Sequence, residues 1–420
     1  MEELSDKVYV FGVGMTKFGK FLDKSIKKFT GEAIDSVLED CQNEINLSDI
    51  EAAWFSNTCW GMYDFQHSIR GQVALSANRL DKIPIINVEN ACASGSTAFH
   101  GAWATIKAGL YDCALAIGVE KVYNEDRAKM MKGFITYTDV EKTTKMIEQL
   151  KKMAEKKKAM DAKKQGTEER KEKKGGHSAF MDLYAVAARQ HMKQHGTTQR
   201  HLAVVAAKNH NNSTLNPLAQ YTFPLTVEQV MEDYEVAYPL TRAMCAPVGD
   251  GAAAAILCSE KFLKQHPNTR AVLIRASVLQ SGSWKTDDIA KRASKIAYKM
   301  SGLEPKDINV AEVHDATAFG EIHQIEQMGF CPIGEGGPFT ESGATALDGK
   351  IPINPSGGLL SRGHPLGASG LAQIYELVVQ LRGEAGKRQI DNHKFALAEN
   401  GGGNIGVGEA AMCVNIFENV

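Results

Sequence analysis

Short runs rich in β-branched and aromatic residues alternate with helical patterns over the first part of the chain. The runs that predict strands are 7–14, 52–57, 83–90 and 113–122. Apolar residues at helical spacing predict two longer helices, over about 28–43 and 94–109. Strands that are apolar along their whole length and alternate with helices are typical of an α/β fold. We therefore expect buried, largely parallel strands.

The same alternation begins again after residue 268. A strand is predicted over 270–280, a helix over 287–302 and a further strand from 308 onward. The two stretches share this pattern far more than they share residues. We expect two pseudo-repeated α/β halves: an N-terminal half formed by 1–121 and 248–267, and a C-terminal half formed by 268–420.

The interval from 122 to 247 does not follow this alternation. Within it, about 141–176 is rich in lysine. The apolar residues of this stretch are spaced like one stripe of a helix: Met146, Ile147, Leu150, Met153 and Met160. Three interpretations stay open: a solvated excursion whose stripe packs on the protein body, a rim that attracts phosphate groups over a substrate channel, or a docking surface for a partner chain.

Composition restricts the class of protein. The chain has 420 residues, 43% of them hydrophobic, and a net charge of -2, so it can bury a large core and has no global bias toward nucleic acid or anionic lipid. No signal peptide, membrane span or retention signal is apparent, and we expect a cytoplasmic protein. The eight cysteines form no CxxC pair and no Cys/His ligand spacing, so we expect reduced thiols and no metal site.

Cys92 is the first candidate for chemistry. It lies in NVENACASGSTAFHG, where a predicted strand gives way to a helix, so it falls before or at the first helical turn. The helix dipole and the unpaired N–H groups of a first turn favour a thiolate and lower the thiol pKa. Small neighbours would let an acyl chain approach. A packed core thiol is the alternative, and position alone does not decide between the two.

Three further segments contain candidate residues. His364 stands in a turn fixed by Pro365 and flanking glycines, where it could meet a thiol. His314 and Asp315 follow an apolar run, at the strand edge where open α/β sheets bind ligands; the alternative is an Asp that caps the next helix. The segment FALAENGGGNIGVGEAA could expose the backbone N–H groups of Gly401, Gly402 and Gly403 to an oxyanion, or could be a glycine-rich turn.

In this order, the four segments resemble the thiolase superfamily, and most closely the branch similar to the sterol carrier protein 2 thiolases. The likeness also includes 8–19, 245–257 and 354–389, and thus covers nearly the whole chain. The resemblance implies a thiolase fold in which the two halves stack as five layers, α/β/α/β/α, with a loop domain inserted at 122–247. It further implies a homodimer or a dimer of dimers. Some relatives of this branch work with a small zinc-ribbon/OB-fold subunit.

The resemblance also implies roles for individual residues. Cys92 would carry the acyl group, His364 would be the base that activates it, and His314 would help to hold the thioester oxygen. Ser356, Gly357 and Asp315 would belong to the substrate and CoA site. The implied function is that of an acyl-CoA thiolase of lipid or aromatic acid metabolism, which cleaves or forms a 3-oxoacyl-CoA through an acyl-cysteine. CoA would be a substrate, and no permanently bound cofactor is needed.

The chain departs from the family at both usual positions of a second cysteine. Ala316 stands where the HDCF loop of the branch has its cysteine, and Glu399 stands at the cysteine position of the CxG motif. Three outcomes stay open. Glu399 or His314 acts as the base for the α-proton; or the protein performs acyl transfer or retro-aldol cleavage; or it binds acyl-CoA without turnover. We favour the first, because a binding protein has no chemical need for both Cys92 and His364.

Overall fold

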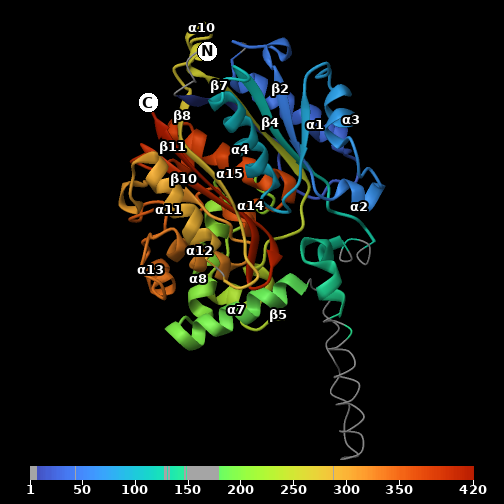
Figure 1. Cartoon of the computed structure of the whole chain (residues 1–420). Coiled ribbons are helices and arrows are strands. Elements are labelled where there is room, and N and C mark those ends of the chain that lie inside the picture. Colours follow the sequence, from blue (N-terminus) through green and yellow to red (C-terminus); the bar gives the residue numbers. More distant parts are fainter. Residues whose placement is uncertain are drawn as a thin grey trace, which may run out of the picture.

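The computed structural model describes residues 7–42, 44–126, 130, 133–145, 148, 179–286 and 288–420. Most of the lysine-rich stretch predicted over 141–176, and its apolar stripe, therefore lies outside the described residues. Figure 1 shows the arrangement of the described elements. None of the described helices combines the length and the apolar character needed to cross a membrane.

The strands and the two longer helices that the sequence predicts in the N-terminal half form close to their predicted positions. The strands are β1 (Val8–Met15), β2 (Ala52–Ser56), β3 (Ile85–Val88), β4 (Cys113–Glu120) and β7 (Gly251–Ser259). The helices are α1 (Ile26–Asp40), α2 (Trp60–Asp64), α3 (Arg70–Ser76), α4 (Ser94–Lys107) and α10 (Glu260–Gln265). Except for β3, these strands are buried along their whole length, which explains their apolar sequences.

The C-terminal half repeats this plan. Its strands are β8 (Val272–Ser281), β9 (Val310–Glu312), β10 (Phe395–Ile405) and β11 (Gly408–Asn419). Its helices are α11 (Ile289–Ser301), α12 (Ala318–Gln327), α13 (Gly336–Glu341), α14 (Gly358–Arg362) and α15 (Leu366–Leu381).

Strand pairing shows the repeat directly. In the N-terminal half, β1, β7 and β4 pair antiparallel, and β4, β2 and β3 pair parallel. In the C-terminal half, β8, β11 and β10 pair antiparallel, and β10 and β9 pair parallel. The two sets join through β1 and β8 into one sheet of order β3-β2-β4-β7-β1-β8-β11-β10-β9. The prediction of largely parallel strands is therefore wrong, because helices on both faces make antiparallel strands equally apolar.

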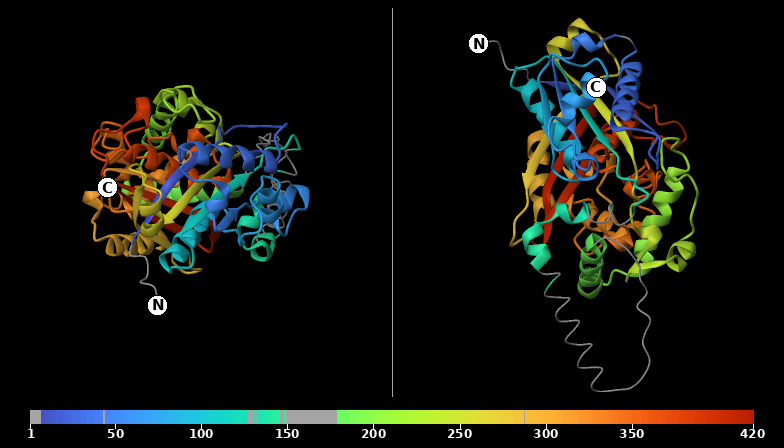
Figure 2. Two further views of the ribbon diagram at one scale, coloured as in Figure 1. Left: turned by 90° about the horizontal axis from the view of Figure 1, so that it is seen from above. Right: turned by 90° about the vertical axis from the view of Figure 1, so that its right-hand side faces the viewer.

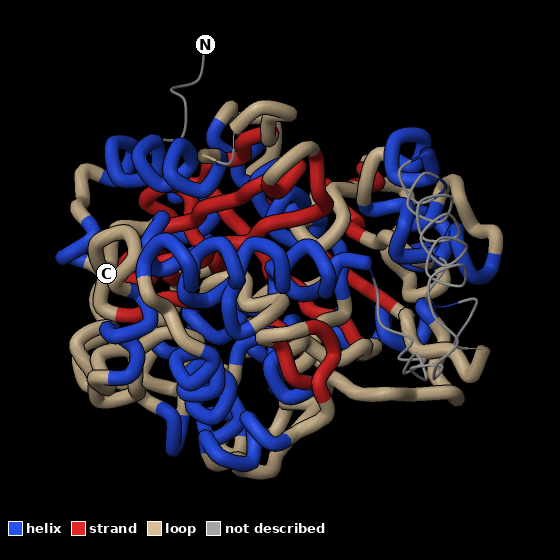
Figure 3. Tube along the Cα trace, turned by 90° about the horizontal axis from the view of Figure 1, so that it is seen from below, coloured by secondary structure: helices blue, strands red, loops and turns tan. Residues whose placement is uncertain are grey.

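Helices α4 and α15 lie side by side between the two halves of the sheet (Figure 1). Alternate residues of the strands face these two helices and form the central core, while the other residues face α1 on one side and α11 on the other. The layers are therefore helix, sheet, helix, sheet and helix, the expected five-layer stack. Figure 3 shows the strands enclosed by helices.

A third region lies between β4 and β7 in the chain. It contains α7 (Ala179–His195), α8 (Gln199–Ser213), α9 (Val227–Glu232), and the short strands β5 (Glu235–Ala237) and β6 (Leu240–Thr241). It shares an apolar core with α12 and α14 of the C-terminal half, and α8 packs on α12, α13 and α14 (Figure 2). The residue boundaries predicted for the two halves and the insertion stay a prediction.

Candidate active site

Cys92 lies in the tight turn that joins β3 to α4. The N–H of Ala93 donates to the carbonyl of Asn90 at 3.0 Å, and that of Ser94 to the carbonyl of Ala91 at 3.1 Å. Ala91 adopts a left-handed conformation with φ of 49°, which is uncommon for a residue with a side chain. The turn places Cys92 two residues before the first residue of α4, as the sequence predicts.

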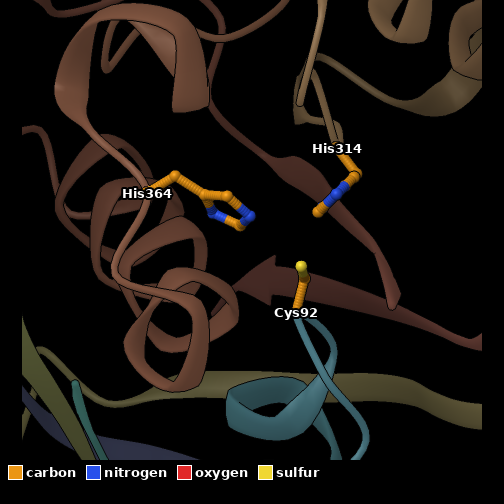
Figure 4. Close-up of side chains that lie close together, drawn as sticks. All are labelled: Cys92, His314 and His364. Atoms are coloured by element: carbon orange, nitrogen blue, oxygen red, sulfur yellow. The ribbon is translucent and has the colours of Figure 1, made fainter. Parts of the chain in front are cut away.

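Two histidines from distant parts of the chain meet this cysteine. His314 follows β9, and His364 stands between α14 and α15. Both rings point toward the sulfur of Cys92 (Figure 4), and the sulfur and one nitrogen of each ring lie within 4.8 Å of one another. The rings are arranged edge to face, with centroids 5.4 Å apart. Sulfur and imidazole nitrogen are also ligands of soft divalent metals, and among the described residues no other cluster offers three such groups.

Burial dominates the acidity of Cys92. It raises the thiol pKa to about 12, and the charge of Glu120 acts in the same direction. The backbone N–H groups of Gly403 and of Cys92 itself donate to the sulfur and oppose this rise. The prediction that the helix start would lower the pKa is therefore wrong, because desolvation of the thiolate outweighs the nearby N–H groups. At neutral pH Cys92 is a thiol that needs a base.

His364 is held by the first turn of its own helix. Its Nδ1 lies 2.7 Å from Oγ of Ser369, and that hydroxyl donates to the carbonyl of Pro365 at 2.9 Å. Burial, with the neighbouring His314 and Arg362, holds the pKa of His364 well below its usual range. The imidazole is therefore neutral and able to accept a proton.

His314 is held by the neighbouring strand. Nδ2 of Asn400 lies 3.1 Å from Nδ1 of His314, and Oδ1 of Asn400 accepts a hydrogen bond from Oγ of Ser96 at 3.0 Å. Ser96 belongs to α4, four residues after Cys92. Burial lowers the pKa of His314 to about 4, so this ring is neutral as well.

The structure does not bring Glu399 into the cluster of Cys92 and the histidines. Oε2 of Glu399 accepts a hydrogen bond from the backbone N–H of His314 at 2.8 Å. Because strand residues alternate between faces, Glu399 and Asn400 leave β10 on opposite sides, and Asn400 is on the side of Cys92. Burial holds the pKa of Glu399 well above its usual range.

The three glycines after Asn400 belong to strand β10, not to a turn. Gly403, with φ of 64°, donates its N–H to the sulfur of Cys92. A Cβ atom at Gly402 would overlap the backbone of the Cys92 turn at Asn90 and Ala93, so this glycine permits the close approach. Gly401 faces Glu409 on the other side of the strand. Of the three predicted N–H donors, the geometry therefore favours Gly403.

Three residues that the resemblance assigns to the substrate and CoA site do not line the cavity beside the cluster: Ser356, Gly357 and Asp315. Ser356 is buried and donates to Glu312 at 2.8 Å, and Gly357 precedes α14 with φ of 98°. Asp315 is buried and accepts from the N–H of Leu359 at 2.6 Å. The alternative interpretation of Asp315, as a helix cap, fits this contact better. The helix that it caps is α14, whereas the next helix in the chain, α12, is capped by Thr317.

A cavity of about 820 Å³ opens beside the cluster, with His364 and Ala316 in its wall. Its apolar lining consists of Val122, Met130, Phe134, Met181, Phe223, Leu225, Val236, Ala243, Ala246, Pro247, Val248, Leu360 and Leu366. Lys20, Asp233 and Arg242 also line it, and Arg242 pairs with Asp233 at 2.7 Å. A long, mostly apolar group that ends in a reactive carbonyl would fit this shape.

Comparison with known proteins identifies the family. The model of the thiolase N-terminal domain matches residues 8–261, and that of the thiolase C-terminal domain-like family matches residues 275–414. The chain belongs to the thiolase family. As a thiolase it is an enzyme of the acyltransferase class that acts on acyl-CoA.

Individual relatives match this thiolase over almost its whole length. The acetyl-CoA acetyltransferase of Methanothermobacter thermautotrophicus is 38% identical over 98% of this chain and 99% of its own. Sterol carrier protein 2 of Bos taurus is also 38% identical, over 97% of this chain and 72% of its own. The solved structure titled Ltp2-ChsH2(DUF35) aldolase shares the fold, with a TM-score of 0.74, 19% identity and coverage of 99% of both chains.

Sequence reasoning missed three residues that support the histidines of this thiolase: Ser369 contacts His364, Asn400 contacts His314, and Ser96 contacts Asn400. A signal was present for Asn400, because strand alternation puts adjacent residues on opposite faces, and only one of Glu399 and Asn400 can face Cys92. Ser369 follows His364 by five residues, which places it on the first turn of α15. No local pattern indicated that Ser96 and Asn400 would meet.

Proposed function

We propose that this thiolase cleaves or forms a 3-oxoacyl-CoA through an acyl group carried on Cys92. The observation that carries the proposal is the cluster in which the sulfur of Cys92 and ring nitrogens of His314 and His364 lie within 4.8 Å. The three residues come from three separate loops, and His364 is in the wall of a cavity of about 820 Å³. A buried, neutral thiol beside two neutral imidazoles is suited to nucleophilic attack on a carbonyl group.

Each member of the cluster has a role in this reaction. The sulfur of Cys92 attacks the ketone carbon after its proton passes to a histidine. The negative charge on the ketone oxygen is stabilised by N–H donors, each worth about 3 kcal/mol of barrier when well placed. Gly403 and Cys92 offer backbone N–H groups beside the sulfur, which supports this role. The carbon–carbon bond then breaks, and acetyl-CoA leaves as its enolate and takes up a proton.

The test is direct turnover of acetoacetyl-CoA with free CoA. We expect loss of the oxoacyl thioester with the wild type and a fall of at least 1000-fold with Cys92→Ala, roughly what loss of a catalytic nucleophile costs. Mass spectrometry of the wild type exposed to acetyl-CoA should find an acetyl group on Cys92. Equal rates for the two proteins would overturn the proposal.

A second candidate is acyl transfer without carbon–carbon chemistry. It is favoured because neither usual position of the second cysteine holds a thiol. Ala316 stands at one of these positions, and Glu399, which lies on the side of β10 away from Cys92, stands at the other. Such an enzyme would exchange acetyl groups between acetyl-CoA and labelled CoA but would leave acetoacetyl-CoA intact. Retro-aldol cleavage would differ from both, because it would turn over a 3-hydroxyacyl-CoA without free CoA and without Cys92.

We further propose that the thiolase is a homodimer. Strand β3 is one of the two edge strands of the sheet, and its residue Ile86 is 37% exposed. An exposed apolar edge strand is suited to pairing with a second copy. Because Cys92 follows β3 closely, such a pairing would also fix the catalytic turn. A small zinc-ribbon/OB-fold subunit is a further candidate partner, supported by the solved aldolase whose title names a DUF35 protein.

A further inference from the structure

We propose that His364 performs both proton transfers of the reaction, and that Ser369 and Asn400 are positioning residues that hold the two histidines in opposite tautomers. In this arrangement Nε2 of His364 is the only base within the cluster of Cys92, His314 and His364, and Nε2–H of His314 is a permanent hydrogen-bond donor. The inference rests on the proposed function. In this thiolase a second proton transfer by His364 would do what the second cysteine does in other thiolases.

The tautomer of His364 follows from Ser369. A serine hydroxyl has a single hydrogen, and that of Ser369 is donated to the carbonyl of Pro365 at 2.9 Å. Toward Nδ1 of His364, 2.7 Å away, Ser369 is therefore an acceptor. Nδ1 must carry the hydrogen, and Nε2 keeps its lone pair. The free lone pair lies on the side of the ring that faces Cys92 (Figure 4).

The tautomer of His314 follows from Asn400. The amide nitrogen of Asn400 can only donate, and it lies 3.1 Å from Nδ1 of His314. Nδ1 is thus an acceptor, and Nε2 carries the hydrogen. The amide orientation is set by Ser96, whose hydroxyl donates to Oδ1 of Asn400 at 3.0 Å. With the amide reversed, its nitrogen would face the Ser96 hydroxyl, which would lose this acceptor.

The other residues that the sequence offers as a second base are removed by their positions. Ala316 has no titratable group, and Glu399 is bound to the backbone of His314 from the far side of β10. His314 has its lone pair engaged by Asn400, so it accepts no proton at Nδ1 without losing that contact. The α-carbon of the substrate is separated from the sulfur by only the ketone carbon. A base within reach of the sulfur is therefore within reach of the α-carbon.

The protons balance on one nitrogen. In the first half-reaction, Nε2 of His364 takes the thiol proton of Cys92 as the sulfur–carbon bond forms. The bond between the ketone carbon and the α-carbon then breaks, its electron pair goes to the enolate, and Nε2 gives the same proton to the α-carbon. In the second half-reaction, Nε2 takes the thiol proton of free CoA as that sulfur attacks the acyl group. It returns the proton to the leaving sulfur of Cys92.

The first test separates one base from two. Exchange of the α-hydrogens of acetyl-CoA with D2O reports proton transfer at carbon, and alkylation of Cys92 by iodoacetamide reports proton transfer at sulfur. We expect His364→Asn to reduce both rates at least 100-fold. Glu399→Gln retains an acceptor for the N–H of His314, and it should leave both rates within about threefold of the wild type. Loss of exchange in Glu399→Gln with normal alkylation would identify Glu399 as a second base and overturn the proposal.

The second test addresses the tautomers. Neutron diffraction from deuterated protein crystals should find deuterium on Nδ1 of His364 and on Nε2 of His314; the reverse at either ring would overturn the assignment. Ser369→Ala should slow alkylation of Cys92 at least tenfold at neutral pH, and Ser369→Thr should restore it, a rescue that a purely structural role for the residue does not require. Asn400→Leu should lower kcat at least tenfold while alkylation stays normal, because alkylation forms no oxyanion.

These outcomes remain distinct from failure of the proposed function. If the wild type neither acquires an acetyl group on Cys92 nor turns over acetoacetyl-CoA, the proposed function fails. The alkylation rates and the neutron densities would still report on the two tautomers, because neither depends on a thioester.

Discussion

Glu312 and Arg362 form an ion pair of 3.0 Å in the interior, and each precedes a histidine of the active site by two residues. Both side chains are fully buried. Ser356 joins the pair, since its hydroxyl lies 2.8 Å from Glu312 and 3.1 Å from Arg362. The pair therefore ties the loop of His314 to the loop of His364 and fixes the separation of the two rings.

Replacing Arg362 should damage both stability and activity. Arg362→Met leaves Glu312 buried without its cation, which typically costs about 3–5 kcal/mol. Urea unfolding measures this loss, and kcat of the folded variant should also fall. Arg388→Met is a matched control, because it breaks the buried pair of Arg388 with Glu376 at 2.9 Å. That control should lose stability with little change in kcat; equal losses of kcat would remove the positioning role of Arg362.

In His364→Asn, which lacks the proposed base, alkylation of Cys92 should rise with pH well beyond neutrality. Because burial raises the thiol pKa to about 12, the thiolate fraction keeps increasing as pH rises toward that value. Rates of iodoacetamide labelling between pH 6 and 10, with Cys92→Ala as the blank, measure the profile. A plateau below pH 7 would contradict the buried neutral thiol.

Gly358 should not tolerate a side chain. A Cβ atom there would overlap the carboxylate of Asp315, and the residue has φ of 59°. Gly358→Ala must displace Asp315 from the N–H of Leu359, so we expect a loss of about 1–3 kcal/mol and a lower kcat. Gly302→Ala is the control, since Gly302 has φ of 73° but nothing near its missing Cβ. Thermal unfolding of the two variants should differ, with Gly358→Ala the less stable.

The buried histidine His314 should make the fold sensitive to acid. Its pKa is lowered from 6.5 to about 4, so the unfolded chain binds a proton in a range where the native ring does not. The stabilising contribution is complete above pH 6.5 and is lost as pH falls toward 4, by about 3 kcal/mol in total. His314→Asn should flatten the dependence of unfolding free energy on pH in this window. His195→Asn, at an exposed position, should not; identical slopes in all three proteins would contradict the prediction.

Charge on the free edge strand should dissociate the proposed dimer. Ile86→Lys puts a charge in the middle of β3, where pairing with a second copy would bury it. Light scattering should find a dimer for the wild type and a monomer for the variant. Leu110→Lys is the control, because Leu110 is 67% exposed but lies outside β3. A wild-type monomer, or two variants with the same mass, would count against this interface.

Local patterns were sufficient for most of the elements and for the position of Cys92 before the first turn of a helix. The strands from β1 to β4 and helices α1, α4 and α11 form close to their predicted positions, because burial and side-chain spacing act over a few residues. They were not sufficient for strand direction, because a strand covered on both faces is apolar whichever way its neighbours run. The lysine-rich stretch stays a prediction, since it lies outside the described residues.

The sequence by itself determined that Cys92 stands at the start of a helix, that His364 and His314 stand in loops, and that both usual second cysteines are missing. Only the tertiary structure decided the chemistry of these groups. The thiol pKa depends on how deeply the sulfur is buried, and the exclusion of Glu399 depends on which face of β10 points to Cys92. Which nitrogen of each imidazole ring carries the hydrogen depends on Ser369 and Asn400, and the orientation of the Asn400 amide depends on Ser96 of α4. Hydrogen bonds between segments that are distant in the sequence form only after these segments have packed together.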